Sequence, residues 1–430
     1  MLLEFSIGNY LSFKDIKTLS LIASPISEFK ENTFKTDHHT LLKGGVIYGS
    51  NSSGKSNFIR AMSTMRRFVL HSFNQSSAKP LNVTPFLLST TTEKLPSHFE
   101  VVFQILNNRY RYGFEVDNIK IRSEWLFETK KQSEKALFIR EGNGIEVASI
   151  FKEGKDLESK TRDNALFLAV VDQFNGPISK RIMKWFKQFI AISGLRHENY
   201  QNVTFRMLEK ESTAKALIDF FKQLDLGFTS ISLDKKLFDS KELPEDTPGP
   251  LLELLVKDLE GKYRMIIKSL HKKFDENNKP VTDVEFDLRE QESSGTNKFF
   301  NISGPIFDVL HNGGVLVVDE LDASLHPLMT LAICNLFNSE KSNPNNAQLI
   351  FATHDSNLLS YGNYRRDQIY FIEKDQYGAS DIYSLIEYRE ENGSKIRKDR
   401  SFEKDYIEGR YGAIPYIGDI SKLATEWQES

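Results

Sequence analysis

The spacing of apolar and polar residues changes several times along the first part of the chain. Residues 1–24 alternate as the two strands of a hairpin would. Val46–Tyr48 is a short apolar run, and Asn57–Leu70 then carries apolar residues at helical spacing. Residues 72–97 are rich in Ser, Thr, Asn and Pro, which indicates a loop. The pattern therefore predicts a hairpin, a strand and a helix, followed by a long connection.

A block of alternating residues comes next and is typical of an antiparallel sheet. His98–Leu106 and Arg109–Val116 alternate well, and Asn107-Asn108 between them tolerates the left-handed turn of a hairpin. Ile119–Thr129 and Ala136–Val147 predict further strands, the latter containing a Gly-Asn-Gly turn.

From residue 156 to residue 225 the period becomes helical. One expected helix has an apolar face opposite a basic face, and residues 207–225 form a second amphipathic helix. The basic face could contact nucleic acid or could simply be a solvated helix surface. Residues 239–250 are expected to form an acidic loop, and Tyr263–Leu270 and Val284–Arg289 to form strands. The apolar face consists of Ile178, Ile182, Trp185, Phe186 and Phe189, and the basic face of Lys180, Arg181, Lys184 and Lys187.

The run Val46–Tyr48 leads into a segment with the G-x-x-x-x-G-K-[ST] spacing of a phosphate-binding loop. Its glycines let successive backbone N–H groups point at phosphate oxygens, and the next helix offers its N-terminal end to them. The lysine would reach the β- and γ-phosphates, and the serine hydroxyl would ligate Mg²⁺. The predicted nucleotide-binding residues are Gly49, Ser50, Asn51, Ser52, Ser53, Gly54, Lys55, Ser56 and Asn57, with Lys55 also catalytic and Ser56 also a metal ligand.

Two later apolar runs end in polar residues. Val315–Val318 leads into Asp319 and Glu320, and such a run suits a strand buried on both faces of a parallel sheet. Ligands bind beyond the carboxyl ends of such strands, so Asp319 would hold Mg²⁺ through water and Glu320 would activate the attacking water. Gln348–Ala352 is a second apolar run, and it ends in a polar group that includes His354. The acids could instead cap a helix, and the histidine could be a hydrogen-bonded core residue.

Composition and charge restrict the partners and the cellular compartment that can be expected for the chain. The chain has 430 residues, a net charge of −3 and a pI of about 6.4, so any nucleic-acid contact must be a local patch. Cys334 is the only cysteine and stands in an apolar helical stretch, which suits a core residue in a reducing cytoplasm. No apolar run reaches about 18 residues and no secretion signal is present, so neither a membrane span nor secretion is expected.

Further segments carry a resemblance to a known family. Glu292–Lys298 precedes the run ending in Asp319, and Leu321–Pro327 follows it directly. In this order the segments resemble the ATP-binding-cassette (ABC) ATPase heads of structural-maintenance and recombination proteins. Within that group the chain resembles the bacterial AAA15-type ATPases, which include RloA-like and AbiL-like proteins and the ATPase of the PARIS anti-phage system. Asn9–Asp15 and Ser401–Pro415 match the start and the tail of that family.

The resemblance implies an α/β fold of the ABC-type P-loop NTPases, with a mainly parallel central sheet, an antiparallel β subdomain and a helical insert or lid. It implies that Glu320 is the catalytic base and that Asp319 holds the metal. The glutamine that bridges the helical part to the metal has no clear position; Gln75 and Gln104 are candidates. By the same resemblance, Ser293, Gly295 and Thr296 form a signature that closes on the nucleotide of a second subunit, Asp322 lies in the loop that crosses the dimer interface, and His354 senses the γ-phosphate.

The expected domains follow from this assignment. Residues 1–155 would form the N-terminal half of the ATPase core, 156–260 a helical insert, 261–390 the C-terminal half, and 391–430 a tail packed on the core or at an interface. The tail begins with a basic cluster that could meet phosphates or an acidic partner, or could be a solvated loop. The cluster consists of Lys395, Arg397, Lys398, Arg400 and Lys404.

The implied function is Mg²⁺-dependent ATP hydrolysis by a cytoplasmic homo-oligomer that acts as a sensor or scaffold in bacterial anti-phage defence. The implied partner is a separately encoded effector, commonly a TOPRIM-type nuclease, and DNA is a possible further partner. One alternative is a DNA-repair or recombination ATPase resembling the RecF group, which would bind DNA directly. Another is a nucleotide-gated scaffold with negligible turnover, because the signature departs from the usual double glycine followed by Gln or Glu.

Overall fold

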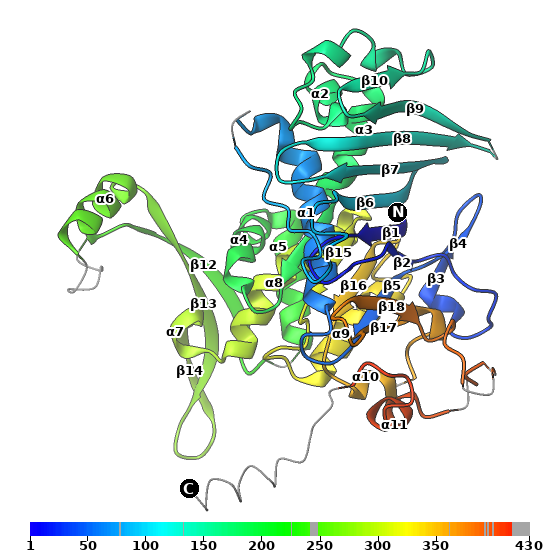
Figure 1. Ribbon diagram of the computed structural model, residues 1–430. Coiled ribbons are helices and arrows are strands. Elements are labelled where there is room, and N and C mark those ends of the chain that lie inside the picture. Colours follow the sequence, from blue (N-terminus) through cyan, green and yellow to red (C-terminus); the bar gives the residue numbers. More distant parts are fainter. Residues whose placement is uncertain are drawn as a thin grey trace, which may run out of the picture. The chain divides into compact units, whose positions relative to one another are not determined.

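A computed structural model of the chain describes residues 1–76, 79–131, 133–224, 226–240, 248–360, 362–390, 393, 395–397 and 400–414. The chain divides into two compact units (Figure 1). The first comprises residues 1–195, 309–323 and 330–430, and the second comprises residues 196–308 and 324–329. Among the described residues, no helix is both long and apolar enough to span a membrane.

The first unit contains an antiparallel sheet of seven strands, as the alternating residues predict. In spatial order its strands are β10 (Gly144–Val147), β9 (Ser133–Glu141), β8 (Ile121–Lys130), β7 (Asn108–Val116), β6 (Ser97–Ile105), β1 (Leu2–Gly8) and β2 (Lys17–Ser20). A separate two-stranded ribbon pairs β3 (Thr33–Lys35) with β4 (Thr40–Leu42).

The turn between β6 and β7 differs from the one expected at Asn107-Asn108. Ile105 pairs with Asn108, so the two loop residues are Leu106 and Asn107, and Asn108 already belongs to the strand. Leu106 takes the left-handed conformation, with φ of 52°. The cross-strand register fixes which residues form the turn, and it overrides the preference of asparagine for positive φ.

The second sheet of the first unit has six strands and is mainly parallel. In spatial order these are β11 (Phe189–Ser193), β15 (Val315–Asp319), β16 (Gln348–Ala352), β5 (Gly44–Tyr48), β17 (Ile369–Lys374) and β18 (Ser380–Ser384). Only β18 runs antiparallel to its neighbour. The expected α/β class, with a mainly parallel central sheet and a separate antiparallel sheet, is confirmed. The carboxyl ends of β15, β16, β5 and β17 therefore meet at one edge.

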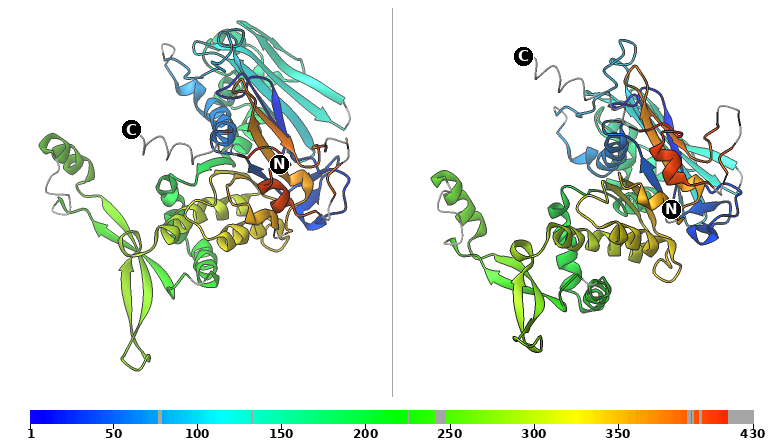
Figure 2. Two further views of the ribbon diagram at one scale, coloured as in Figure 1. Left: turned by 60° about the horizontal axis from the view of Figure 1, so that its bottom comes forward. Right: turned by 90° about the horizontal axis from the view of Figure 1, so that it is seen from below.

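Helix α1 (Lys55–His71) begins at the phosphate loop and packs against strands of both sheets (Figure 2). Its Phe58 is fully buried and lies edge-on to Phe5 of β1, with ring centroids 5.7 Å apart. A single cluster of buried apolar residues includes α1 and strands of both sheets. This continuous core positions the helix that follows the loop.

Three other helices of the first unit complete its core. In α3 (Pro177–Lys187), Trp185 stacks on Phe103 of β6 at 4.2 Å, and the four cations of the opposite face are exposed. Helix α2 (Phe167–Gln173) precedes it. Cys334 is buried in α9 (Pro327–Asn338), and burial raises the pKa of its thiol to about 12. Cys334 is therefore a core residue, as expected.

The helical insert expected from residue 156 contains a strand of the central sheet. Phe189 was expected on the apolar face of a helix, but α3 ends at Lys187 and Phe189 begins β11, opposite Val315 of β15. A residue three positions after Phe186 continues a helical stripe, and it can equally begin a short strand. The second unit consequently begins at Arg196 and extends to Asp308, across the expected boundary at residue 260.

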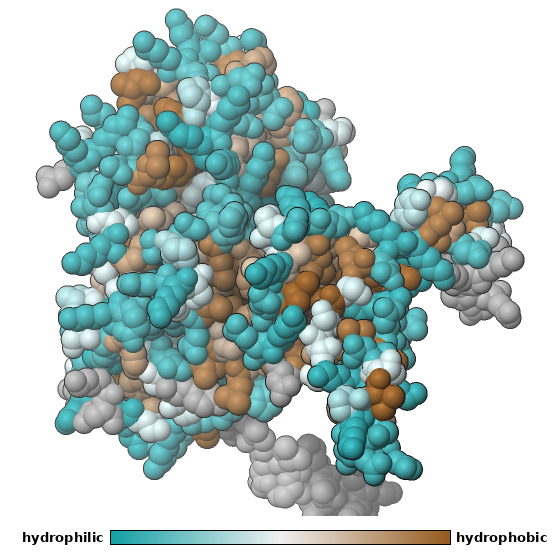
Figure 3. All heavy atoms as spheres, turned by 180° about the vertical axis from the view of Figure 1, so that it is seen from behind, coloured by the Kyte–Doolittle hydropathy of each residue, from teal (hydrophilic) through white to brown (hydrophobic). Residues whose placement is uncertain are grey.

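The second unit combines helices with a three-stranded antiparallel sheet. The strands expected at Tyr263–Leu270 and Val284–Arg289 are present with shifted ends, and Gly249, expected in a loop, begins a helix. Residues 241–247 of that acidic loop lie outside the described residues. Figure 3 shows apolar surface on the helix that begins at Gly249, where Leu254 is 60 % exposed. The strands are β12 (Ser230–Leu237), β13 (Tyr263–Phe274) and β14 (Pro280–Asp287), and the helices are α4 (Gln201–Leu208), α5 (Glu211–Gln223), α6 (Gly249–Leu259), α7 (Leu288–Gln291) and α8 (Ser294–Asn312).

Helix α8 carries Pro305 in its interior and is supported there by α4. The Thr204 hydroxyl accepts a hydrogen bond from the Gly304 N–H at 3.1 Å and donates one to the Phe300 carbonyl at 3.0 Å. A side chain at Gly304 would collide with the backbone of Thr204. The Thr204 hydroxyl thus satisfies backbone groups of α8 close to Pro305, where the helical ladder loses an N–H.

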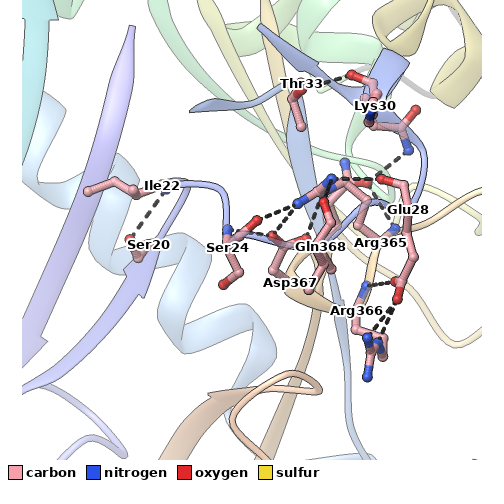
Figure 4. Close-up of polar contacts among 12 residues, drawn as sticks. Ser20, Ile22, Ser24, Glu28, Lys30, Thr33, Arg365, Arg366, Asp367 and Gln368 are labelled. Atoms are coloured by element: carbon pink, nitrogen blue, oxygen red, sulfur yellow. Dashed lines mark hydrogen bonds and ion pairs between the residues drawn. The ribbon is translucent and has the colours of Figure 1, made fainter. Parts of the chain in front are cut away.

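A buried ion pair fixes the chain that leads into β17 (Figure 4). Arg365 Nη2 lies 2.9 Å from Asp367 Oδ2, and both side chains are almost fully buried. The same guanidinium donates to the carbonyls of Ser24 and Glu28, and Asp367 accepts from the Ser24 N–H at 2.7 Å. Because both charges are also hydrogen-bonded to the backbone, this cluster holds residues 24–28 against the start of β17.

The C-terminal segment, residues 400–414, packs on β5 and β17 through aromatic side chains. Tyr406 of α11 (Phe402–Ile407) lies 5.4 Å from the ring of Tyr48 and 5.5 Å from that of Phe371. The Ala413 N–H donates to Glu373 at 3.1 Å. Of the expected basic cluster, Arg400 is paired with Glu390 and Asp405 and Lys404 with Glu408, whereas Lys398 lies outside the described residues.

Candidate functional site

A cavity of about 430 Å³ lies beside the loop that follows β5. It is lined by residues 50–57 together with Glu320, His354 and Lys374. Glu320 comes directly after β15, His354 two residues after β16, and Lys374 ends β17. The structure therefore brings together side chains from four neighbouring parallel strands, three of which the sequence had singled out.

Both glycines of the loop stand where a side chain would not fit. A Cβ at Gly49 would collide with the Ile372 carbonyl of β17 and lie 2.6 Å from the Ser53 hydroxyl. Gly54 has φ of 121°, and a Cβ there would lie 2.9 Å from the Ser12 hydroxyl. Close approach at the first position and backbone conformation at the second explain the requirement for glycine.

Lys55 is held inside the loop. Its Nζ donates hydrogen bonds to the Gly49 carbonyl at 2.6 Å and to the Ser50 carbonyl at 3.0 Å. Burial lowers the pKa of Lys55 to about 8, although the carboxylates of Asp319, Glu320 and Asp322 oppose the shift. The ammonium group is thus mostly charged at neutral pH but close to its titration range.

Ser56 and Asp319 meet in space although 263 positions separate them. The Ser56 hydroxyl donates to Asp319 Oδ1 at 3.2 Å. Burial raises the pKa of Asp319, while the Ser56 hydrogen bond and Lys55 oppose that shift. The two oxygens are ligands of the kind that Mg²⁺ prefers. Within the described residues, no group of three or more His, Cys, Asp or Glu is placed to hold a metal ion. Mg²⁺ sites that use one or two protein oxygens complete their coordination with phosphate and water.

Glu320 has a backbone conformation that is unusual for glutamate. Its φ of 54° is left-handed, which costs a non-glycine residue roughly 1–3 kcal/mol. Such conformations persist where the surrounding structure enforces them, and they concentrate at functional sites. Here the strained turn places Glu320 at the cavity directly after the buried strand β15.

A hydrogen bond within the chain joins the backbone of His354 to the side chain of Asp322. The His354 backbone N–H donates to Asp322 Oδ2 at 3.2 Å, while the other oxygen of Asp322 is buried without a hydrogen-bond partner among the described residues. Burial and then the charge of Lys55 lower the pKa of His354, against the pull of Asp322, Glu320 and Asp319. A neutral imidazole at the cavity can donate a hydrogen bond without adding charge.

Two residues that the sequence did not single out for this site support the loop. The Ser12 hydroxyl accepts from Asn57 Nδ2 at 2.9 Å, and the Ser12 carbonyl accepts from the Ser380 N–H at 2.7 Å. The Ser380 hydroxyl in turn donates to the Ser53 carbonyl at 2.6 Å. Ser12 lies in the segment Asn9–Asp15 that carried the family resemblance, and this contact gives the segment a structural role.

Lys374 is a third residue that the sequence did not indicate. It ends β17, and Ile372, two residues earlier in the strand, closely approaches Gly49 of the loop. The available signal was an apolar run, Ile369–Ile372, followed by charged residues, as in Val315–Glu320. That run did not stand out because no recognised motif surrounds it.

The signature residues lie in the second unit, where they shape the start of α8. The Ser293 hydroxyl accepts from the Thr296 N–H at 3.1 Å, as the N-cap of a helix does, and lies 2.9 Å from the Thr296 hydroxyl. A Cβ at Gly295 would lie 2.7 Å from the Ser324 carbonyl. Ser293 is exposed, whereas Thr296 is buried. These residues therefore have local structural roles, and their expected role in a second subunit stays a prediction.

Neither candidate for the bridging glutamine lines the cavity. Gln104 lies in β6 and its side chain donates to the Leu106 carbonyl at 2.8 Å. Gln75 follows the far end of α1, a helix of 17 residues, and so lies about 25 Å from the loop along the helix axis.

Comparison with known proteins places the chain in a family. No curated protein matches it. Among solved structures, it is similar to the "SMC head domain from Thermotoga maritima", with 12 % sequence identity and a TM-score of 0.40 over 89 % of this chain and 98 % of that one. Residues 46–360, well over half of the chain, match the family described as "AAA domain, putative AbiEii toxin, Type IV TA system". The narrower resemblance to AAA15-type, RloA-like and PARIS proteins stays a prediction. The chain belongs to this family of AAA domains.

Proposed function

We propose that the protein binds ATP with Mg²⁺ and hydrolyses it to ADP and phosphate. The observation that carries this proposal is the contact of Ser56 with Asp319, at 3.2 Å, in the cavity that residues 50–57 share with Glu320. It joins a phosphate loop, two oxygen ligands and a carboxylate in one place. These are the parts that phosphoryl transfer to water requires.

Each part has a task set by its position. Backbone N–H groups of the loop and the N-terminal end of α1 would hold phosphate oxygens, and Lys55 would supply positive charge. Glu320 would orient the attacking water or take its proton. His354, with its lowered pKa, would donate a hydrogen bond near the γ-phosphate as a neutral ring. A bound Mg²⁺, held by Ser56 and Asp319, would offset negative charge on the phosphates.

We further propose that two copies of the chain complete the site. In this arrangement Ser293, Gly295 and Thr296 close on the nucleotide of the second copy, and Asp322 lies near the contact. The exposure of Ser293 at the start of α8 supports this proposal, because a partner can reach it. Bound ATP would then join two chains, and hydrolysis would separate them. A larger homo-oligomer built from such pairs is compatible with the same contacts.

The cellular role that we propose is a cytoplasmic sensor or scaffold in bacterial anti-phage defence. In this role the ATPase controls a separately encoded effector, for which a TOPRIM-type nuclease is the leading candidate. The family description, which names a putative AbiEii toxin and a Type IV TA system, supports a place in a bacterial toxin system. The narrower AAA15-type resemblance in the motifs supports defence in particular.

A RecF-like repair ATPase that binds DNA directly is the second candidate function. The exposed basic face of α3, formed by Lys180, Arg181, Lys184 and Lys187, favours it. A scaffold with negligible turnover is the third, and the loose signature sequence favours that one. Turnover measured with and without DNA separates the second candidate from the other two.

The deciding experiment measures phosphate release and particle mass on the same samples, with and without Mg-ATP. The proposal expects Mg²⁺-dependent phosphate release, growth in mass with Mg-ATP, and loss of both in Lys55→Ala. Growth in mass without phosphate release would support the scaffold, and release that requires DNA would support the repair ATPase. The proposal would be overturned if the folded parent protein bound no Mg-ATP and released no phosphate.

A further inference from the structure

The cavity contains a second cation besides Lys55, which is Lys374 at the end of β17. Its side chain is exposed, and it lines the same space as the phosphate loop. Nothing in the motifs of the chain gives this lysine a role. Its place in the sheet, however, restricts what it can contact.

The order of the strands puts Lys374 on the opposite side of the loop from Glu320 and His354. Strands β15, β16, β5 and β17 are adjacent in that order and parallel. Neighbouring strands lie about 4.8 Å apart, so His354 and Glu320 are one and two strands from β5 on one side, and Lys374 is one strand away on the other. Phe371 pairs with Tyr48, and Lys374 extends three residues beyond it, or about 10 Å, to the level of the loop.

The negative charges around the cavity and on a bound nucleotide exceed what one lysine can offset, so a second cation would stabilise the complex. Asp319, which Ser56 contacts, and Glu320, which lines the cavity, bring two carboxylates to one side of the loop. A di- or triphosphate adds further negative charge. Lys374 lies on the side away from both carboxylates, where a cation can offset phosphate charge without being paired to them.

The neighbouring residue holds this end of β17 in place from outside. Glu373 accepts the Ala413 N–H at 3.1 Å, and Gly412 packs against its carboxylate. Successive side chains of a strand point to opposite faces. Because the Glu373 side chain points to the C-terminal segment, the Lys374 side chain points the other way, to the cavity. The rings of Phe371 and Tyr406, 5.5 Å apart, support the same strand. Lys374 is therefore a lysine on a supported strand end and not on a free loop.

We propose that Lys374 is a second phosphate-contacting residue, which binds the α- and β-phosphates of the nucleotide held by the loop. The inference rests on the proposed nucleotide binding. Attack on the γ-phosphate is expected on the side of Glu320 and His354, so Lys374 faces the part of the phosphate chain that ADP and ATP have in common. It contributes to affinity for both nucleotides and does not distinguish between them.

The test measures the Kd for Mg-ADP and Mg-ATP by isothermal titration calorimetry on the full chain. Lys374→Ala is expected to weaken both about tenfold and by the same factor, because a charged hydrogen bond is lost. Lys374→Arg, which keeps the charge, is expected to stay within about threefold of the parent. Lys135→Ala is the matched control, since Lys135 is also exposed on a strand, in β9 of the antiparallel sheet, and is expected to change neither Kd.

Thermal unfolding without nucleotide shows whether each variant is folded, and Lys374→Gln replaces Lys374→Ala should the latter not fold. Unchanged affinity of the folded variant, in a parent whose binding is lost in Lys55→Ala, would overturn the role of Lys374 and leave the proposed function standing. A loss confined to ATP would overturn it as well, since the contact would then be to the γ-phosphate. A parent that binds neither nucleotide would refute the proposed function itself.

Discussion

The phosphate-loop cavity of the first unit and the signature segment of the second unit differ in whether their polar side chains have hydrogen-bond partners within the chain. Around the cavity, side chains from four parallel strands converge. The Ser53 hydroxyl, which lines the cavity, and one oxygen of Asp322, next to His354, are buried without a hydrogen bond among the described residues. In the signature segment, Ser293 and Thr296 hydrogen-bond to one another and cap α8.

The contrast teaches that the two short patterns differ in what they predict. The cavity combines an unsatisfied Ser53 hydroxyl with a strained Glu320 at one open space. The signature residues would be needed for their helix even without a nucleotide. Their proposed role in a second subunit therefore requires a separate test.

The largest effect is expected at Glu320. Glu320→Gln should lower steady-state phosphate release about 100- to 10,000-fold, the range that general bases supply, because the amide cannot take a proton. Its Kd for ATP should change little, and particle mass with Mg-ATP should match or exceed that of the parent. Glu340→Gln, an exposed acid outside the cavity, is the control. Unchanged turnover in Glu320→Gln would remove the carboxylate from the mechanism.

The next effect concerns the signature segment. Ser293→Asp should keep the stability of the protein, because aspartate caps helices as well as serine does. It should weaken ATP-dependent assembly at least tenfold, because a carboxylate would face the phosphates of the partner's nucleotide. Ser401→Asp at the N-cap of α11 is the matched control. If sedimentation velocity shows that Ser293→Asp assembles with Mg-ATP as the parent does, the role in a second subunit is wrong and only the cap remains.

The pH dependence of nucleotide binding tests Lys55. Because burial lowers its pKa to about 8, the free protein loses the ammonium charge as pH rises through about 8. Phosphate binds the charged form, so the Kd for ATP should be flat below about pH 7 and should rise up to about tenfold per unit above pH 8. Calorimetry across this range checks the profile, and Lys374→Ala should keep its shape. A flat profile up to about pH 9 would mean that Lys55 is not titrated there.

The smallest effect is expected at Tyr406, whose hydroxyl donates to the Ala413 carbonyl at 3.4 Å and is hydrogen-bonded to the backbone of Gly49 at the start of the loop. Tyr406→Phe should lower the free energy of unfolding by about 1 kcal/mol and weaken ATP binding no more than about threefold. In the same layer of aromatic residues, the Tyr388 hydroxyl donates to the Arg410 carbonyl, and Tyr388 is not among the residues that line the cavity. Tyr388→Phe should therefore cost similar stability in urea unfolding and leave the Kd unchanged; equal changes of Kd in both variants would contradict this.

Much of the site follows from local patterns. The spacing from Gly49 to Ser56, the acids after Val315–Val318 and His354 after Gln348–Ala352 all predicted residues that the structure places at or beside one cavity. Their location could be predicted because buried parallel strands are continuous apolar runs whose carboxyl ends meet at one edge of the sheet. The same patterns did not find β11, since a five-residue strand directly after α3 continues the apolar stripe of the helix.

Other features of the site and of the fold could not be predicted from local patterns, because they depend on which distant segments become neighbours. Lys374 and Ser380 reach the loop only because β17 pairs with β5 and β18 pairs with β17, and no local period encodes that order. The turn at Leu106 and the extension of the second unit to Asp308 likewise follow from register and long-range contact.

The amino-acid sequence by itself determined which residues of the loop, which acids and which histidine to expect at the site, because each stands in a local pattern whose geometry is set within a few residues. The tertiary structure alone decided that Ser56 meets Asp319, that Asp322 holds the His354 backbone, and that Lys374 faces the cavity. The physical reason is that strand pairing is a choice among distant partners, made by packing of the whole core and not by any single segment.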